Sequence, residues 1–193
     1  MKRMMILLAA FAISVILVPV GGGRLQRLAD ISLRHGWTLP AALVLQLLAT
    51  TIIPSAGEGL LTAVHLLSYG LAAVFLLTNL RLPGLWVLTV GAGLNVIAIV
   101  ANGGVMPARA GAMEAAGIAM PAPGEFANSQ AVAHARLSFL GDVFAWPRPL
   151  PLHNVFSVGD VLIVAGAAIA IHRITGSHLW RRLRRVHSVG RAS

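Results

Sequence analysis

The sequence predicts an all-α integral membrane protein: one domain over residues 1–193, a bundle of about five transmembrane helices with an outer amphipathic segment. Of the 193 residues, 57% are hydrophobic and only 11% are charged, whereas roughly 25% of a soluble domain is charged. Five apolar runs are close to the length that a membrane span needs. These runs cover residues 4–20, 38–54, 60–80, 84–102 and 155–172.

The first run, 4–20, follows Lys2 and Arg3 and therefore also has the form of a secretory signal sequence. Three glycines follow it in place of a small-residue cleavage site, so we expect it to be retained as a span. The next segment, 24–37, mixes leucines with arginines and predicts a short amphipathic helix in the membrane interface. Trp37 suits an interfacial anchor at the start of the second span.

The second and third spans each have one polar face. Gln46 and Thr50 lie four residues apart and therefore share a face of the second helix. In the third span, small and polar residues recur at helical spacing. These residues are His65, Ser68, Ala72 and Asn79. We expect both faces to point toward other helices.

The fourth and fifth spans each contain a stripe of small residues, and the fourth adds two asparagines. The stripes are Gly91, Asn95, Ala98 and Asn102 in one span, and Gly159, Gly166 and Ala170 in the other. Small residues allow helices to approach closely, and an asparagine in hydrocarbon must find a partner. We therefore expect both stripes to face the interior of the bundle, with two glycines ending the fourth helix.

Residues 103–153 form the predicted extracytoplasmic segment and contain six of the ten prolines. Within it, Ser129 to Trp146 predicts a helix that lies on the membrane. The side chains expected to dip inward are Leu137, Phe139, Leu140, Val143, Phe144 and Trp146. A loop of this length is typical of a functional segment or of disorder, and its aromatic residues argue against disorder.

The tail, 173–193, predicts a basic amphipathic helix on the cytoplasmic membrane surface. Its arginines are expected to bind anionic lipid, with an acidic partner protein as the competing interpretation. The lipid-binding candidates are Arg181, Arg182, Arg184 and Arg185. The net charge of +9 thus reflects membrane topology, and we expect no nucleic-acid partner.

The distribution of basic residues predicts the orientation of the chain. With the tail in the cytoplasm, ten arginines lie inside and five basic residues lie outside. The outer set is Lys2, Arg3, Arg109, Arg136 and Arg148. Because basic residues favour the cytoplasmic side, we expect a multi-pass protein of the bacterial plasma membrane, with its N-terminus outside and its C-terminus inside.

Four pieces of sequence resemble a known family. They are GGGRLQRLA after the first span, GLNVIAIVANGGVMP at the end of the fourth, FLGDV in the outer segment, and NVFSVGDVLI at the start of the fifth. Together they are similar to a family of small bacterial multi-pass membrane proteins known as domain of unknown function 5317. The resemblance covers nearly the whole chain and implies the membrane architecture, but it implies no activity.

Asp160 is the main candidate for chemistry, because a carboxylate near the membrane boundary is costly unless it is paired, solvated or protonated. The competing interpretation is structural: Ser157 and Asp160, three residues apart, fit a capping box. Asp142 and Asp160 could also form a catalytic pair that activates water. NVFSVGD is remotely similar to the motif around one catalytic aspartate of lipoprotein signal peptidase.

An outer polar pocket is the second candidate site. Its predicted lining, with Asp160, is Asn95, Asn102, His65 and Ser157. The alternative is that these side chains form hydrogen bonds that fix helix packing. No second histidine or carboxylate lies at ligand spacing from His65, so we expect no metal, and nothing predicts a cofactor. The chain has no cysteine, which excludes thiol chemistry.

The sequence favours a non-enzymatic helical bundle that scaffolds or assembles a membrane partner, because every polar residue has an adequate structural role. The alternative is a small outward-facing membrane enzyme or ligand-binding protein that uses the pocket around Asp160 and Asn95. A transporter is the weakest of the three, because five spans give no inverted repeat.

Overall fold

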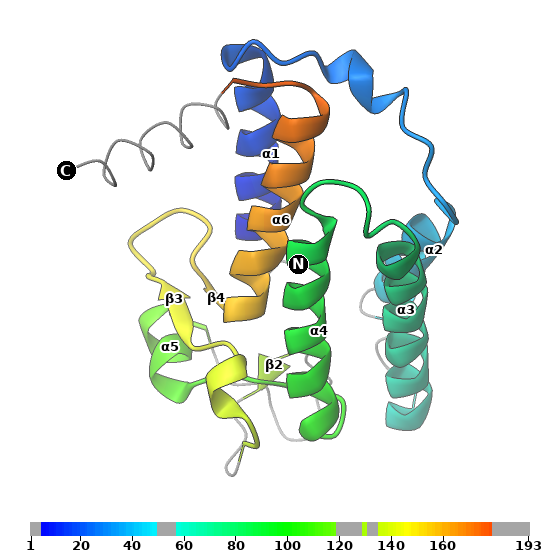
Figure 1. The fold of residues 1–193 in the computed structure, drawn as a ribbon. Helices are drawn as coiled ribbons and strands as arrows, with labels where there is room; N and C mark the ends of the chain where they lie inside the picture. The colour runs from blue at the N-terminus through cyan, green and yellow to red at the C-terminus, as the bar shows by residue number, and fades with distance from the viewer. Residues whose placement is uncertain (1–4, 50–56, 119–128, 131–134, 179–193) are drawn as a thin grey trace, which may run out of the picture.

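The computed structural model describes residues 5–49, 57–118, 129–130 and 135–178 (Figure 1). Helices form most of it, as the sequence predicts. They are α1 (Met5–Val20), α2 (Thr38–Leu47), α3 (Glu58–Thr78), α4 (Leu85–Ala101), α5 (Ala110–Ala115) and α6 (Val158–Ile174). The short strands form two pairs: β1 (Met106–Pro107) lies parallel to β2 (Ser129–Gln130), and β3 (Phe144–Trp146) lies antiparallel to β4 (Asn154–Phe156).

Helix α6 lies at the centre of the bundle. It packs against α1 on one side and α4 on the other, and the α2–α3 pair lies beyond α4 (Figure 1). The segment between α4 and α6 folds into a lobe at one end of the bundle, built from α5 and the short strands. Residues 21–37, before α2, and residues 175–178, after α6, lie at the other end.

Glycines determine how closely α4 and α6 approach. A Cβ atom added to Gly91 would lie 2.5 Å from the Gly159 carbonyl oxygen, and one added to Gly166 would meet the backbone nitrogen of Leu88. The two backbones are therefore in direct contact along the predicted stripes. Gly91, Gly159 and Gly166 are buried, which confirms that the stripes face each other inside the bundle.

Helix α4 ends where the sequence predicts. Gly103 and Gly104 both have positive φ, at +70° and +94°, and the Gly104 N–H donates to the Ile99 carbonyl at 2.9 Å. The N–H groups of this left-handed turn donate to the last free carbonyls of the helix. The chain can then reverse into the lobe.

The predicted helix over Ser129–Trp146 is wrong in its described part. Leu137 adopts a left-handed φ of +51°, only a three-residue 3₁₀ turn follows, and Phe144–Trp146 is a strand. The aromatic residues fit the strand because Phe144 stacks on Phe156 of β4, with ring centroids 5.4 Å apart. Phe139, Phe144 and Trp146 are exposed, whereas Leu140 packs against a cluster of Ala98, Ile99 and Met106.

The predicted amphipathic helix over 24–37 is also wrong, because only Leu25–Leu28 forms one 3₁₀ turn. The cause is a long-range contact. The Asn79 side chain at the end of α3 accepts from the Arg34 N–H at 3.0 Å and donates to the Arg34 carbonyl at 2.8 Å. These bonds hold residues 34–37 in a turn directly before α2. Trp37 is 65% exposed at the start of α2, the place expected for an anchor.

Within the described ranges, one helix is long and apolar enough to cross a membrane. It is Gly59–Thr78, with a mean hydropathy of 2.0. Three other helices are apolar but shorter: Ile6–Val20, Thr38–Leu47 and Leu85–Ala101. The end of the predicted second span and most of the basic tail, including Arg181, Arg182, Arg184 and Arg185, lie outside the described residues.

Candidate functional site

Asp160 is the centre of a closed ring of hydrogen bonds between α4 and α6. Its Oδ1 atom accepts from Asn95 Nδ2 at 2.8 Å, and its Oδ2 atom accepts from the Ser157 N–H at 3.0 Å. Ser157 Oγ donates to Asn95 Oδ1 at 2.8 Å and accepts from the Asp160 N–H at 3.0 Å. Each side-chain oxygen and nitrogen of Asn95, Ser157 and Asp160 thus has a partner in the ring.

The ring contains the capping box that the sequence predicts. Ser157 begins α6 and bonds the N–H of Asp160, whose side chain bonds the N–H of Ser157. The carboxylate also lies at the positive end of the helix dipole. Asn95 extends the cap to a second helix, because Gly159 leaves room for the Asn95 side chain; a Cβ there would overlap Asn95 Oδ1.

A second polar group joins α3 to α2. The Tyr69 hydroxyl and His65 Nε2 are 2.7 Å apart, and the two rings meet edge to face with centroids 4.5 Å apart. Gln46 of α2 is a hydrogen-bond partner of Tyr69, and Asp160 lies close enough to act on Tyr69 electrostatically. Through Tyr69, polar side chains of α2, α3, α4 and α6 are therefore connected.

Asn102 has a different role from Asn95, although both lie on the predicted stripe. Its Nδ2 atom donates to the Ala98 carbonyl at 2.7 Å and to the Arg136 carbonyl at 2.8 Å, and its Oδ1 atom accepts from the Arg136 N–H at 2.9 Å. Asn102 thus fastens the lobe to the end of α4. The structure does not bring it into the ring.

Asp142 lies in the lobe, 5% exposed. Its N–H donates to the Pro107 carbonyl at 2.9 Å, and its carbonyl accepts from the Arg109 N–H at 3.0 Å. Both Asp160 oxygens already accept hydrogen bonds from Asn95 and Ser157. Each of these oxygens can accept a second hydrogen bond, so the catalytic pairing of Asp142 with Asp160 stays a prediction.

Sequence reasoning gave no role to Tyr69, the one tyrosine of the chain. The available signal was its position one helical turn after His65, on the same face of α3. It also missed that Arg136 is the partner of Asn102, which no local pattern reveals. Among the described residues, no group of three or more His, Cys, Asp and Glu side chains could hold a metal ion.

Comparisons with known proteins give a family but no activity. A search of the curated proteins and a search of the solved structures each gave no match. The model of a family of unknown function, DUF5317, matches residues 30–172, a range that contains α2 to α5, nearly all of α6 and the whole polar region. The chain therefore belongs to the DUF5317 family.

Proposed function

We propose that the chain is a multi-pass protein of the bacterial plasma membrane, and that its bundle has a non-enzymatic role in scaffolding or assembling a membrane partner. In this proposal five helices cross the membrane, the N-terminus is outside and the tail is cytoplasmic. The lobe between α4 and α6 then faces outward, where it is available to the partner.

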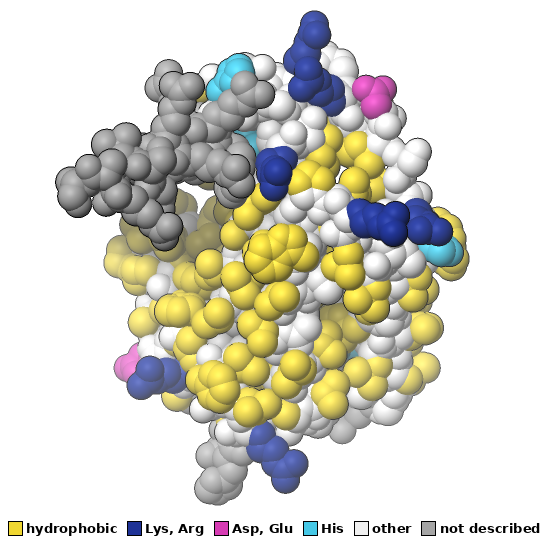
Figure 2. Space-filling model, viewed as in Figure 1, with side chains coloured by type: hydrophobic (Ala, Val, Ile, Leu, Met, Phe, Trp, Pro, Cys, Tyr) yellow, Lys and Arg dark blue, Asp and Glu magenta, His cyan; other side chains and the backbone are white. Residues whose placement is uncertain are grey.

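The exposed apolar surface supports the membrane location. Large apolar side chains more than half exposed occur on four helices. Examples are Ile13 and Ile16 of α1, Leu43 and Leu47 of α2, Leu67 and Leu77 of α3, and Trp86 and Val100 of α4. On the face in Figure 2, apolar side chains cover most of the middle, and charged ones lie toward its upper and lower parts. Soluble proteins rarely expose apolar patches of this extent.

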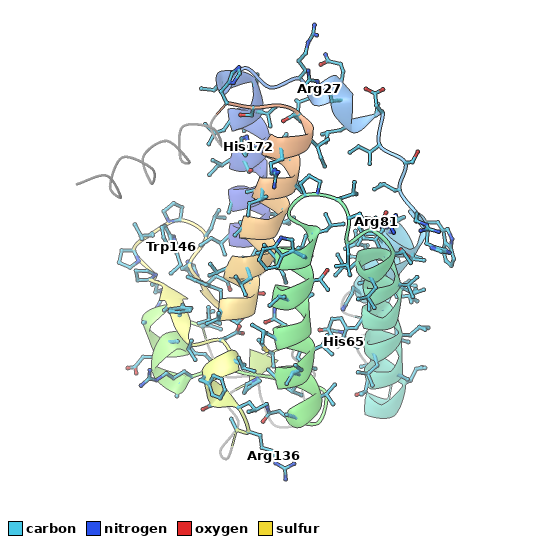
Figure 3. All side chains as sticks on the ribbon, viewed as in Figure 1. Arg27, His65, Arg81, Arg136, Trp146 and His172 are labelled. Carbon is cyan, nitrogen blue, oxygen red and sulfur yellow. The ribbon has the colours of Figure 1, made fainter. Side chains whose placement is uncertain are left out.

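The placement of arginines supports the orientation. Arg27 and Arg81 lie toward the end opposite Arg136 (Figure 3). Arg24 and Arg34 belong to the segment that contains Arg27, whereas the lobe contributes Arg109, Arg136, Arg148 and the acidic Glu114. The more basic end suits the cytoplasmic side.

The non-enzymatic role rests on one observation, the closed ring at Asp160. A general acid or base must exchange a proton with a substrate, and a nucleophile must have a free lone pair directed at one. Here each polar atom of Asn95, Ser157 and the Asp160 side chain is engaged within the ring. Hydrogen bonds of this kind between helices fix their packing, which is the structural role that the proposal gives to the ring.

A specific observation favours a second candidate, an outward-facing ligand-binding or enzymatic pocket. Tyr69 lies close enough to Asp160 for an electrostatic effect without belonging to its ring, and it bonds His65 and Gln46. A polar ligand that entered between α3 and α4 would meet all four side chains. The two candidates differ in whether water reaches this region from outside.

Single-cysteine labelling separates the two candidates, since the wild-type chain has no cysteine. The variants are Asn95→Cys in the polar region, Ser138→Cys on the exposed outer lobe and Ala29→Cys at the opposite end. We expect a membrane-impermeant maleimide to label Ser138→Cys in intact cells, and Ala29→Cys only after lysis. Labelling of Ala29→Cys in intact cells would contradict the orientation.

We expect Asn95→Cys to stay unlabelled until the protein is denatured, because the ring region is packed. Rapid labelling of Asn95→Cys from outside, in a variant that still elutes as a single species in detergent, would favour the ligand-binding candidate over the scaffold.

A further inference from the structure

A charged depression lies at the proposed cytoplasmic end of the bundle, around the 3₁₀ turn Leu25–Leu28. Its volume is about 480 Å³, and it is lined by Arg24, Gln26, Arg27 and Asp30. All four lining residues are exposed. Arg27 lies on this turn at the top of Figure 3. The depression belongs to neither the ring at Asp160 nor the outer lobe.

The backbone around the depression is held by the end of α6. The Arg24 N–H donates to the Thr175 carbonyl at 2.9 Å, and an Arg27 guanidinium nitrogen lies 3.4 Å from the same oxygen. Gly23 packs so closely that an added Cβ would lie 2.8 Å from Val18 and 3.0 Å from Thr175. The backbone of the turn is therefore fixed between the ends of α1 and α6, which sets the positions from which the lining side chains reach a ligand.

The lining side chains have donor and acceptor groups that are free to bind a ligand. Within the part of the chain that the structure describes, the side chains of Arg24, Gln26 and Asp30 have no hydrogen-bond or ion-pair partner. Guanidinium groups bind phosphate oxygens through two parallel hydrogen bonds. A carboxylate in the same depression would repel a simple anion, but it suits the ammonium end of a zwitterion.

The surroundings indicate a lipid as the source of this chemistry. Val20 at the end of α1 is 73% exposed, and Leu25 beside the depression is 39% exposed. In the proposed membrane location, these side chains mark the boundary between hydrocarbon and water. A headgroup in the depression would have its acyl chains beside them.

We propose that Arg24, Gln26, Arg27 and Asp30 bind the zwitterionic phosphoethanolamine headgroup of a membrane lipid. The arginines and Gln26 hold the phosphate, and Asp30 accepts hydrogen bonds from the ammonium group. The inference rests on the proposed membrane location and adds a lipid class. It differs from the predicted anionic-lipid role of the tail, because Asp30 makes the site select an amine.

Lipid titration of the full-length protein in detergent, followed by native mass spectrometry, tests this site. The probes are dioleoyl phosphatidylethanolamine, the phosphatidylcholine with the same chains, which cannot donate from its nitrogen, and the phosphatidylglycerol, which has no amine. We expect phosphatidylethanolamine to bind about tenfold more tightly than either, the size of one charged hydrogen bond. Equal binding of all three would overturn the proposal.

Three variants sharpen the test. Arg24→Gln should weaken binding of all three lipids, and Asp30→Asn should remove the preference for phosphatidylethanolamine and improve binding of phosphatidylglycerol. Arg34→Gln, an exposed arginine of the same segment outside the depression, is the matched control and should change nothing. A loss in Arg34→Gln as large as in Arg24→Gln would show a general charge effect and overturn the site.

Two outcomes keep this proposal separate from the previous one. Displacement of the lipid by an equal concentration of free phosphoethanolamine would identify a soluble ligand and overturn the lipid assignment. The cysteine labelling above tests the membrane architecture independently of lipid class. A protein with the expected labelling but no lipid preference would therefore lose only this site.

Discussion

The contact between α4 and α6 differs in kind from the contact between α4 and α3. Across the first, Gly91 and Gly159 bring the two backbones together, and the ring at Asp160 closes over them. Across the second, side chains make the contact: Tyr69 packs on the cluster that contains Ala98, and Gly70 of α3 faces open space. The α4–α6 pair is therefore fixed at the backbone, whereas the α4–α3 pair depends on side chains that can rearrange.

The largest expected effect comes from breaking the glycine contact. Gly91→Val should destabilise the protein by about 3 kcal/mol, because the new side chain overlaps the Gly159 carbonyl and α6 cannot move away without opening the ring. Thermal unfolding in detergent measures this loss. Gly93→Val on the same helix is the matched control, since nothing lies within 4 Å of a Cβ there. Equal losses in both variants would show that α4 tolerates no valine anywhere.

The next effect comes from opening the ring without changing the backbone contact. Asn95→Leu should cost about 2 kcal/mol, because it leaves Asp160 Oδ1 without its donor and Ser157 Oγ without its acceptor. Denaturation in detergent would again give the value. A stability equal to that of the wild type would mean that water replaces Asn95, which would favour the ligand-binding candidate.

A smaller effect should follow from releasing the lobe. Asn102→Ala removes both hydrogen bonds to the Arg136 backbone and should cost about 1 kcal/mol. Hydrogen exchange should rise over residues 135–141 and stay unchanged in α6. Faster exchange throughout α6 would contradict the division between lobe and bundle.

The smallest effect is expected from removing the Tyr69 hydroxyl, which joins α3 to α2. Tyr69→Phe keeps the ring but removes the hydroxyl that meets His65 and Gln46, and should cost about 0.6 kcal/mol, the average for such bonds between membrane helices. Hydrogen exchange of α2 and α3 should increase while that of α4 and α6 does not. A cost as large as that of Asn95→Leu would show that the Tyr69 hydroxyl holds the bundle together as firmly as the ring at Asp160 does.

The sequence predicted the parts of the fold that local patterns encode. Ser157 and Asp160 are three residues apart, and the glycines of α4 and α6 recur at helical spacing, so the cap and the stripes could be read directly. The errors arose where distant residues decide the backbone. Asn79 holds Arg34 from 45 residues away, and Phe144 pairs with Phe156, so neither segment becomes the helix that its own pattern predicts.

The candidate site shows the same division. The cap at Asp160 was predictable from local spacing. Its hydrogen bond to Asn95 joins residues 65 positions apart, and the stripe on α4 predicted only that Asn95 faces the interior of the bundle. Tyr69 was one turn from His65 and still received no role, because a tyrosine among apolar residues is also typical of plain packing.

The ring at Asp160 also has a consequence for biosynthesis. Asn95 emerges from the ribosome 65 residues before Asp160, which at ordinary elongation rates is an interval of roughly 3 to 13 s. During this interval the Asn95 amide and the glycine surface of α4 have no partner, because α6 has not yet been synthesised. Helix α6 is thus the element that completes the polar ring and the glycine contact. A chain released before residue 160 would expose the unpaired surface of α4 to the quality-control proteases of the cell.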